Sequence, residues 1–216
     1  SIGISDSDIN IMKSLSTLLA NLSEKTSTNW TANIAVDVAH GYSDRAIEVY
    51  NLLSIDSFVN SIMSGSIATP EAVNPLIDSG VTHLRVGIGG GQMCTTRLIT
   101  GCGMPNLSAV FEIFAELNNK AFTYCNDSGN FIVKSKVQIV ADGGIRFPGD
   151  GVKYLAAGAS AFMVGTAFAI CSDSAAPKEI NKDGIAIVYH RGQASYSYQV
   201  ERIGSLRNNC AEGIER

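Results

Sequence analysis

One cysteine in the sequence lies inside a glycine-rich segment, VGIGGGQMCTTR (86–97). Cys94 follows four glycines and precedes two threonines and Arg97. A cysteine becomes a nucleophile when nearby hydroxyls and cations stabilise its thiolate, so this setting is compatible with covalent catalysis. Glycines also permit tight turns and close approach of the backbone to a ligand. The segment could therefore also be a phosphate cradle, a metal site or a plain turn, although it matches neither a P-loop nor a dinucleotide fingerprint.

Other residues with chemical potential follow short apolar runs elsewhere in the chain. Asp37 and His40 follow one such run, and the turns ADGG (141–144) and MVGT (163–166) end two others. The backbone N–H groups beside the glycines of these two turns could bind a phosphate, as the last two loops of a barrel often do. Plain tight turns are the alternative interpretation of the same glycines.

The overall composition limits the classes of function. The 216 residues carry a net charge of -4 with 17% charged residues, which is typical of a globular domain and offers no basic surface for nucleic acid. Five cysteines without a C-x-x-C pair argue against a disulfide framework or structural zinc and favour a reducing, cytoplasmic location. No apolar run reaches the roughly 18–20 residues of a membrane span, and we expect no signal peptide among these residues.

Strand-like and helix-like segments alternate along the chain, according to the spacing of their apolar residues. Expected strands are 1–5, 33–39, 58–67, 82–91, 136–144 and 159–167. Expected helices are 44–53, 69–80, 105–119 and 150–158. The helix over 69–80 has Thr69 as its N-cap, Pro70 at its first position and Gly80 as its C-cap. Repeated βα units imply a parallel sheet with crossover connections.

Two α/β folds fit this pattern, a doubly wound sheet and a (β/α)8 TIM barrel. The candidate residues follow several different strands, and only a barrel gathers all its βα loops around one mouth. We therefore expect a TIM barrel in which 1–216 is a single catalytic domain, covers about six of the eight βα units and is incomplete at both ends. The polar segment 122–136 is expected to be an inserted hairpin or long loop, and a flap is expected at about 193–216.

The quoted motifs, together with DVAHGYS (37–43) and VADGGIRFPGDGVKYLAAGASAFMVG (140–165), resemble the catalytic barrel of the IMP dehydrogenase/GMP reductase family. The resemblance covers nearly the whole chain. It implies that the Cys94 thiolate attacks carbon 2 of a purine nucleoside monophosphate and forms a covalent intermediate. In GMP reductases ammonia leaves and a nicotinamide cofactor delivers hydride to give IMP. In IMP dehydrogenases hydride leaves to NAD and water then releases XMP.

The resemblance also implies roles for individual residues. The residues implied for catalysis are Cys94, Thr96 and, in the flap, Glu212. Asp142 would bind the ribose hydroxyls. The residues implied for phosphate binding are Gln92, Gly143, Gly144, Gly165 and Thr166. Those implied for the purine edge and the flap are Arg191, Gly192 and Gln193. Those implied on the cofactor side are Asp37, Ala39, His40 and Gly41. A monovalent cation, K+ in this family, would lie at Gly89, Gly91 and Cys94.

The flap favours the reductase over the dehydrogenase. IMP dehydrogenases carry an Arg-Tyr pair in a longer flap, whereas the segment from Gly192 to AEG (211–213) is short and has no such pair. The DVAHGYS and PNLSAV segments also look reductase-like, while DGGIRF and EGIER are closer to many dehydrogenases. The resemblance therefore predicts a GMP reductase that uses NADPH, with an IMP dehydrogenase that uses NAD as the alternative, and it implies a homotetramer.

Three positions depart from the family pattern. Gln92 stands where the family has a serine that binds phosphate, Ser66 replaces an asparagine, and Gln193 replaces a methionine. These departures raise two further hypotheses, a divergent enzyme for a modified purine nucleotide and a lapsed enzyme that binds nucleotide as a regulatory subunit. A barrel lyase or isomerase that binds phosphate would not need Cys94. His190, beside Arg191, is compatible with a surface position.

Overall fold

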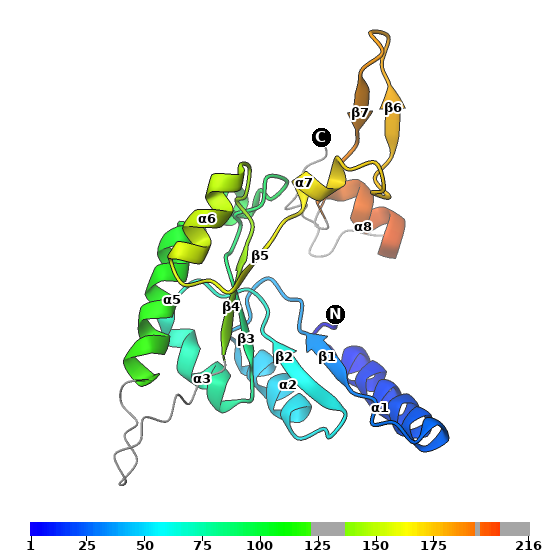
Figure 1. The fold of residues 1–216 in the computed structure, drawn as a ribbon, viewed down its shortest axis with the longest axis vertical. Helices are drawn as coiled ribbons and strands as arrows, with labels where there is room; N and C mark the ends of the chain where they lie inside the picture. The colour runs from blue at the N-terminus through cyan, green and yellow to red at the C-terminus, as the bar shows by residue number, and fades with distance from the viewer. Residues whose placement is uncertain (122–136, 193–194, 204–216) are drawn as a thin grey trace.

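A computed structural model of the chain describes residues 1–121, 137–192 and 195–203. Five strands form one parallel sheet: β1 (Ala32–Ala35), β2 (Val59–Met63), β3 (His83–Val86), β4 (Gln138–Asp142) and β5 (Ala161–Met163). They lie side by side in chain order, and every neighbouring pair is parallel (Figure 1). A doubly wound sheet reverses its strand order at a switch point, so the sequential order is that of a barrel wall. The sheet is thus a half-barrel.

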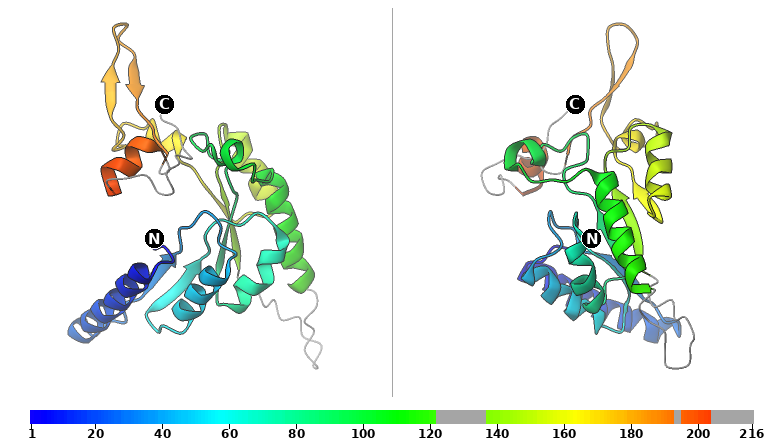
Figure 2. Two further views of the ribbon diagram at one scale, coloured as in Figure 1. Left: turned by 180° about the vertical axis from the view of Figure 1, so that it is seen from behind. Right: turned by 90° about the vertical axis from the view of Figure 1, so that its left-hand side faces the viewer.

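Helices in the crossover connections pack against the sheet (Figures 1 and 2). The connections contain α2 (Asp44–Ser54), the 3-10 turn η1 (Pro70–Ala72), α3 (Val73–Asp78), α4 (Thr96–Thr100), α5 (Asn106–Ala121) and α6 (Pro148–Ala156). The helix expected over 69–80 is therefore divided into η1 and α3. Gly80 has a φ of 88°, as its expected place after a helix end requires.

The hydrophobic core lies between the sheet and these helices. Leu84 and Ile139 of the strands pack with Tyr50, Leu76 and Ile113 of the helices, and each of these side chains is at most 1% exposed. The Tyr50 hydroxyl is satisfied inside this core, because it donates to the Gly41 carbonyl at 3.2 Å and accepts from the Gly65 amide at 3.1 Å. Through these two hydrogen bonds, the Tyr50 hydroxyl connects the loops that follow β1 and β2.

A long helix, α1 (Asp6–Thr26), precedes the sheet and was not expected from the sequence. Its apolar residues, such as Met12 and Leu15, are interrupted by many serines, threonines and asparagines, which have weak helix propensity. The overlooked signal is a capping box, in which Ser5 and Asp8 each bind the other's backbone amide. The strand expected at 1–5 is reduced to a single parallel bridge between Ile2 and Val36.

The chain after β5 contains two further helices and a hairpin within the described residues. The helix α7 (Thr166–Ala169) leads into an antiparallel hairpin of β6 (Lys178–Ile180) and β7 (Ala186–Val188), and α8 (Tyr196–Ile203) follows. The hairpin projects away from the parallel sheet (Figures 1 and 2). The segment 122–136 and most of the expected flap lie outside the described residues. None of the described helices combines the length and apolar character needed to cross a membrane.

Candidate active site

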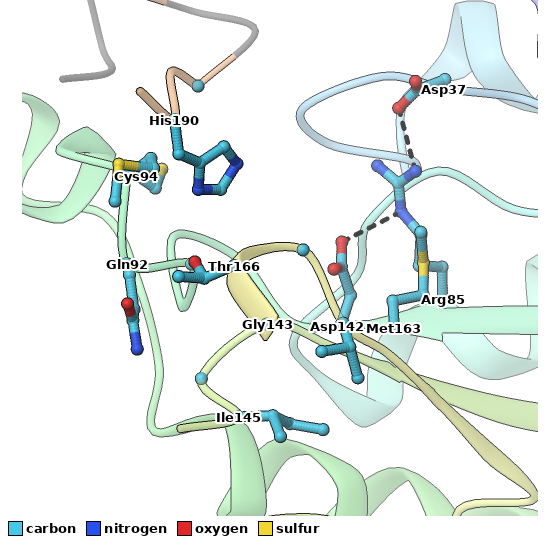
Figure 3. A pocket seen from close by; sticks show the side chains of 16 residues that line it. Asp37, Arg85, Gln92, Cys94, Asp142, Gly143, Ile145, Met163, Thr166 and His190 are labelled. Carbon is cyan, nitrogen blue, oxygen red and sulfur yellow. Dashed lines mark hydrogen bonds and ion pairs between the residues drawn. The ribbon is translucent and has the colours of Figure 1, made fainter. Parts of the chain in front are cut away.

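A pocket of about 450 Å³ lies at the carboxyl ends of β3, β4 and β5. Parallel strands place the loops that follow them along one edge of the sheet, and this explains why distant segments meet here. The lining residues are Asp37, Arg85, 91–94, 142–145, 163–166, His190 and Gly192. Figure 3 shows Cys94, His190, Thr166 and Gln92 in one part of the pocket, with Arg85, Asp37 and Asp142 in the other.

Cys94 lines this pocket and has a defined hydrogen-bond partner. Its thiol donates to Thr96 Oγ1 at 3.0 Å, and its backbone amide donates to the Gly91 carbonyl at 3.1 Å. Of the other cysteines that the structure describes, Cys102 and Cys171 are exposed and neither lines the pocket. The pocket therefore contains a half-buried thiol with a hydroxyl group in contact with its sulfur.

Arg97 does not serve the thiol as the sequence suggested. Its Nε donates to the Ile88 carbonyl at 3.0 Å, and its Nη2 donates to the Met104 carbonyl and to Asn106 Oδ1. These acceptors belong to the two ends of the loop between β3 and α5. The guanidinium thus stabilises the loop that carries Cys94.

Two carboxylates and one arginine form the charged part of the pocket (Figure 3). Arg85 Nη1 donates to Asp37 Oδ1 at 2.9 Å, and Arg85 Nε lies 3.5 Å from Asp142 Oδ2 and donates to Ser66 Oγ at 3.1 Å. Burial raises the pKa of the Asp142 carboxyl above its ordinary value, the Arg85 charge lowers it, and the Asp37 charge raises it again. Burial dominates, so the net direction of the pKa is upward.

Gly143 and Gly144, both predicted to bind substrate, line the pocket in a glycine turn after β4. Gly143 and Gly144 have φ values of 84° and 81°, a region that side chains with a Cβ rarely adopt. A Cβ on Gly143 would also lie 2.8 Å from the Gly91 amide nitrogen, so the loop after β4 touches the loop that carries Cys94. A nucleotide held by the first loop would therefore lie close to the thiol of the second.

His190 enters the pocket from the segment after β7. Its buried Nδ1 has no hydrogen-bond partner among the residues that the structure describes, and its Cε1 lies 3.9 Å from the position of a Cβ on Gly165. The ring also lies near Thr166 and Cys94 (Figure 3). The structure thus places His190 in the pocket, where the sequence alone left a surface position open.

Most of the residues predicted for the substrate lie in this pocket. Gln92, Cys94, Asp142, Gly143, Gly144, Gly165, Thr166 and Gly192 line it, as do Asp37 and Gly91. Thr96 contacts the Cys94 sulfur but does not line the pocket. The other predicted residues that do not line it are Gly89, Ala39, His40, Gly41 and Arg191. Arg191 instead forms an ion pair with Glu201 and lies over the Tyr198 ring at 5.6 Å. Gln193 and Glu212 lie outside the described residues.

Arg85 is the main site residue that the sequence did not reveal. It lies within β3, between the buried residues Leu84 and Val86, and its side chain is 12% exposed. Alternation places Arg85 on the opposite face from these residues, which is the pocket face. A charged residue near the carboxyl end of an apolar strand was the available signal.

A family model described as the IMP dehydrogenase / GMP reductase domain matches residues 23–216. The chain belongs to the IMP dehydrogenase/GMP reductase family. Its structure is similar to that of GMP reductase from Trypanosoma brucei in complex with guanosine 5'-monophosphate, with a TM-score of 0.75 and 30% identity. That similarity covers 100% of this chain and 40% of the solved chain, and it confirms that the half-barrel is part of a TIM barrel.

Curated members of the family carry both enzyme names. GMP reductase from Leishmania donovani is 36% identical over 171 residues, which are 78% of this chain and 32% of that protein. IMP dehydrogenase from Chlorobaculum tepidum is 34% identical over 172 residues, which are 80% of this chain and 32% of that protein. The chain thus spans about a third of the length of these relatives, and it is about as similar to one enzyme as to the other.

Proposed function

We propose that this chain carries the nucleotide site of a GMP reductase, which converts GMP to IMP and ammonia with NADPH. One observation supports the proposal most strongly: Cys94, whose sulfur contacts the Thr96 hydroxyl, and the Asp142 carboxylate at the end of β4 come from distant segments and line one pocket. A lyase or isomerase that only binds phosphate has no use for this thiol. A lapsed enzyme has no reason to keep the thiol and its hydroxyl partner together.

The proposed substrate is a purine nucleoside monophosphate that lies along the pocket. The Asp142 carboxylate accepts hydrogen bonds from the ribose hydroxyls, and the backbone amides of Gly143, Gly144, Gly165 and Thr166 bind the phosphate. Gln92 lines the same part of the pocket as Thr166 and donates its amide N–H to the phosphate (Figure 3). This arrangement directs the purine ring toward Cys94.

The proposed reaction begins with attack of the Cys94 sulfur, as the thiolate, on purine carbon 2. A proton is delivered to the exocyclic amine, ammonia leaves, and a covalent bond between sulfur and carbon 2 remains. The Thr96 hydroxyl contacts the sulfur, so it can pass the proton to the departing amine. Glu212 is the proposed source of that proton. When carbon 2 has been reduced, the sulfur leaves as a thiolate and IMP is released.

Residues at the Asp37 end of the pocket suit a nicotinamide cofactor, which supplies the hydride when bound. Asp37 lines the pocket with about a third of its side chain exposed, and its free oxygen can accept from ribose hydroxyls. Ala39, His40 and Gly41 follow in the same loop. NADPH is the proposed cofactor, and K+ at Gly89, Gly91 and Cys94 and a homotetramer are proposed on the family resemblance.

IMP dehydrogenase is the second candidate, favoured by relatives of that name at similar identity and by the DGGIRF motif (142–147). Product analysis separates the two enzymes. Full-length protein incubated with GMP and NADPH is expected to yield IMP and ammonia, whereas IMP and NAD are expected to yield no XMP. If IMP and NAD yield XMP while GMP and NADPH yield no product, the function is that of an IMP dehydrogenase and the reductase proposal is wrong.

A further inference from the structure

We propose that Arg97 and Asn106 are positioning residues that lock the loop carrying Cys94 to the end of β4, which carries Asp142, and to the turn that follows it. This inference rests on the proposed function of the same pocket. Neither residue lines the pocket, and both act through the backbone of residues that do. Asn106 is one of few buried polar residues in the described part of the chain, with 8% of its surface exposed.

Asn106 uses both ends of its side-chain amide. Its Nδ2 donates to the Asp142 carbonyl at 2.8 Å and reaches the Gly143 carbonyl at 3.5 Å. Its Oδ1 accepts from Arg97 Nη2 at 2.7 Å. A buried amide whose donor and acceptor bind two different loops holds them at a fixed separation, because leaving either end unpaired costs free energy.

Arg97 extends this link to both ends of the loop that carries Cys94. It donates to the carbonyls of Ile88, before the cysteine, and of Met104, after it. One guanidinium therefore closes the loop on itself and fastens it to Asn106. Cys94 lies three residues before Arg97, inside the loop that the guanidinium closes.

Glycines on both sides of Cys94 fit closely around the Arg97 and Asn106 side chains. A Cβ on Gly90 would lie 2.0 Å from Asn106 Nδ2, and a Cβ on Gly89 would lie 2.8 Å from Arg97 Cγ. A Cβ on Gly103 would lie 2.6 Å from the same Arg97 carbon. At least these three glycines thus make room for protein side chains, and the tight fit leaves the link little freedom to shift.

The test measures how fast iodoacetamide alkylates each cysteine of the full-length protein, by peptide mass mapping without nucleotide or cofactor. Cys102 and Cys171 are exposed and serve as internal references in the same digest. In Asn106→Leu, Cys94 is expected to react at least about fivefold faster while both references keep their rates, because the loop opens more often. Arg97→Lys retains the charge but lacks the planar guanidinium whose Nε and Nη2 reach acceptors at both ends of the loop, so it is expected to act in the same direction.

The matched control is Asn74→Leu, which removes an asparagine that binds Glu116 of α5 at 3.1 Å, outside the pocket lining. All three cysteines are expected to keep their rates in this variant. Unchanged Cys94 reactivity in Arg97→Lys and Asn106→Leu would overturn the proposal, as would a common rise at all three cysteines. If Asn106→Leu does not fold, Arg97→Lys decides alone. Because the assay needs no turnover, it separates failure of this link from failure of the proposed reductase activity.

Discussion

Arg85 and Asp37 form an ion pair of 2.9 Å that joins β3 to the loop after β1 inside the pocket (Figure 3). The same guanidinium lies 3.5 Å from the Asp142 carboxylate. Arg85 therefore contacts both Asp37, the carboxylate proposed for the cofactor, and Asp142, the carboxylate proposed for the substrate ribose. The two proposed ligands are linked through Arg85.

Replacing Arg85 should destabilise the protein more at high pH than at low pH. Arg85→Met leaves Asp37 and Asp142 without their shared cation, and we expect the free energy of unfolding to fall by about 2 kcal/mol near about pH 8. The loss should shrink as the pH falls, because Arg85 lowers the pKa of Asp142 and its removal lets that carboxyl take up a proton more readily. Urea unfolding of wild type and Arg85→Met across the pH range measures the loss in free energy of unfolding. Arg85→Lys, which keeps the positive charge, is the control. Equal losses at both ends of the pH range would contradict the prediction.

Asp142→Asn should stabilise the protein at neutral pH while it weakens nucleotide binding. The folded protein raises the pKa of Asp142, chiefly by burial, so the native state binds the proton more tightly than the unfolded chain does. That contribution is complete below the unfolded pKa of about 3.9 and is lost as the pH rises through the higher folded value. Relative to Asp142→Asn, wild type should therefore lose stability between acidic and neutral pH. A pH series of unfolding curves that shows a constant difference would rule this out.

Gln92→Ser should tighten the binding of GMP. The serine hydroxyl replaces the Gln92 amide as the donor to the phosphate, and the shorter side chain leaves more room in the part of the pocket proposed for the phosphate. A better-formed hydrogen bond there corresponds to about fivefold in Kd. Titration calorimetry with GMP measures the change. Gln92→Ala separates the gain in room from the gain of a hydroxyl. Weaker binding by Gln92→Ser than by wild type would mean that Gln92 suits the natural nucleotide better than serine does.

Thr96→Val should reduce turnover with little effect on substrate affinity. Valine has nearly the shape of threonine but cannot accept from the Cys94 thiol or move a proton, so kcat should fall by about 100-fold or more while KM for GMP changes little. Thr95→Val is the matched control, because the Thr95 side chain makes no capping hydrogen bond to α4. A similar loss in both variants would assign the effect to the local backbone.

The sequence was sufficient to predict a partial TIM barrel, in which five of the six expected strands form the sheet, and most of the pocket. Parallel βα units bring the ends of their strands together, so Cys94, Asp142 and Gly165 could be placed at one edge before any distance was known. Arg85 was missed because alternation within a strand separates two faces without saying which one faces the pocket. Leu84 and Val86 are buried, so Arg85 lies on the other face of β3, which faces the pocket. That burial depends on the tertiary structure and cannot be inferred from the strand alone.

The glycine-rich segment shows a second limit of sequence reasoning. Its glycines were interpreted as room for a ligand, yet Gly90 makes room for the Asn106 amide and Gly89 for the Arg97 side chain. Close approach requires glycine in the same way whether the neighbour is a ligand or the protein itself. The helix α1 was missed for a different reason, since its many serines and threonines weaken the local signal while packing of Met12 stabilises it.

The most direct test of the account follows NADPH absorbance in full-length protein supplied with GMP, in wild type and in Cys94→Ala. The account predicts that wild type consumes NADPH only when GMP is present, and that Cys94→Ala still binds GMP but consumes none, because the covalent step requires the thiol. Consumption of NADPH by Cys94→Ala at the wild-type rate would contradict the central role of Cys94. No consumption by wild type, with reduction of NAD by IMP, would contradict the reductase assignment.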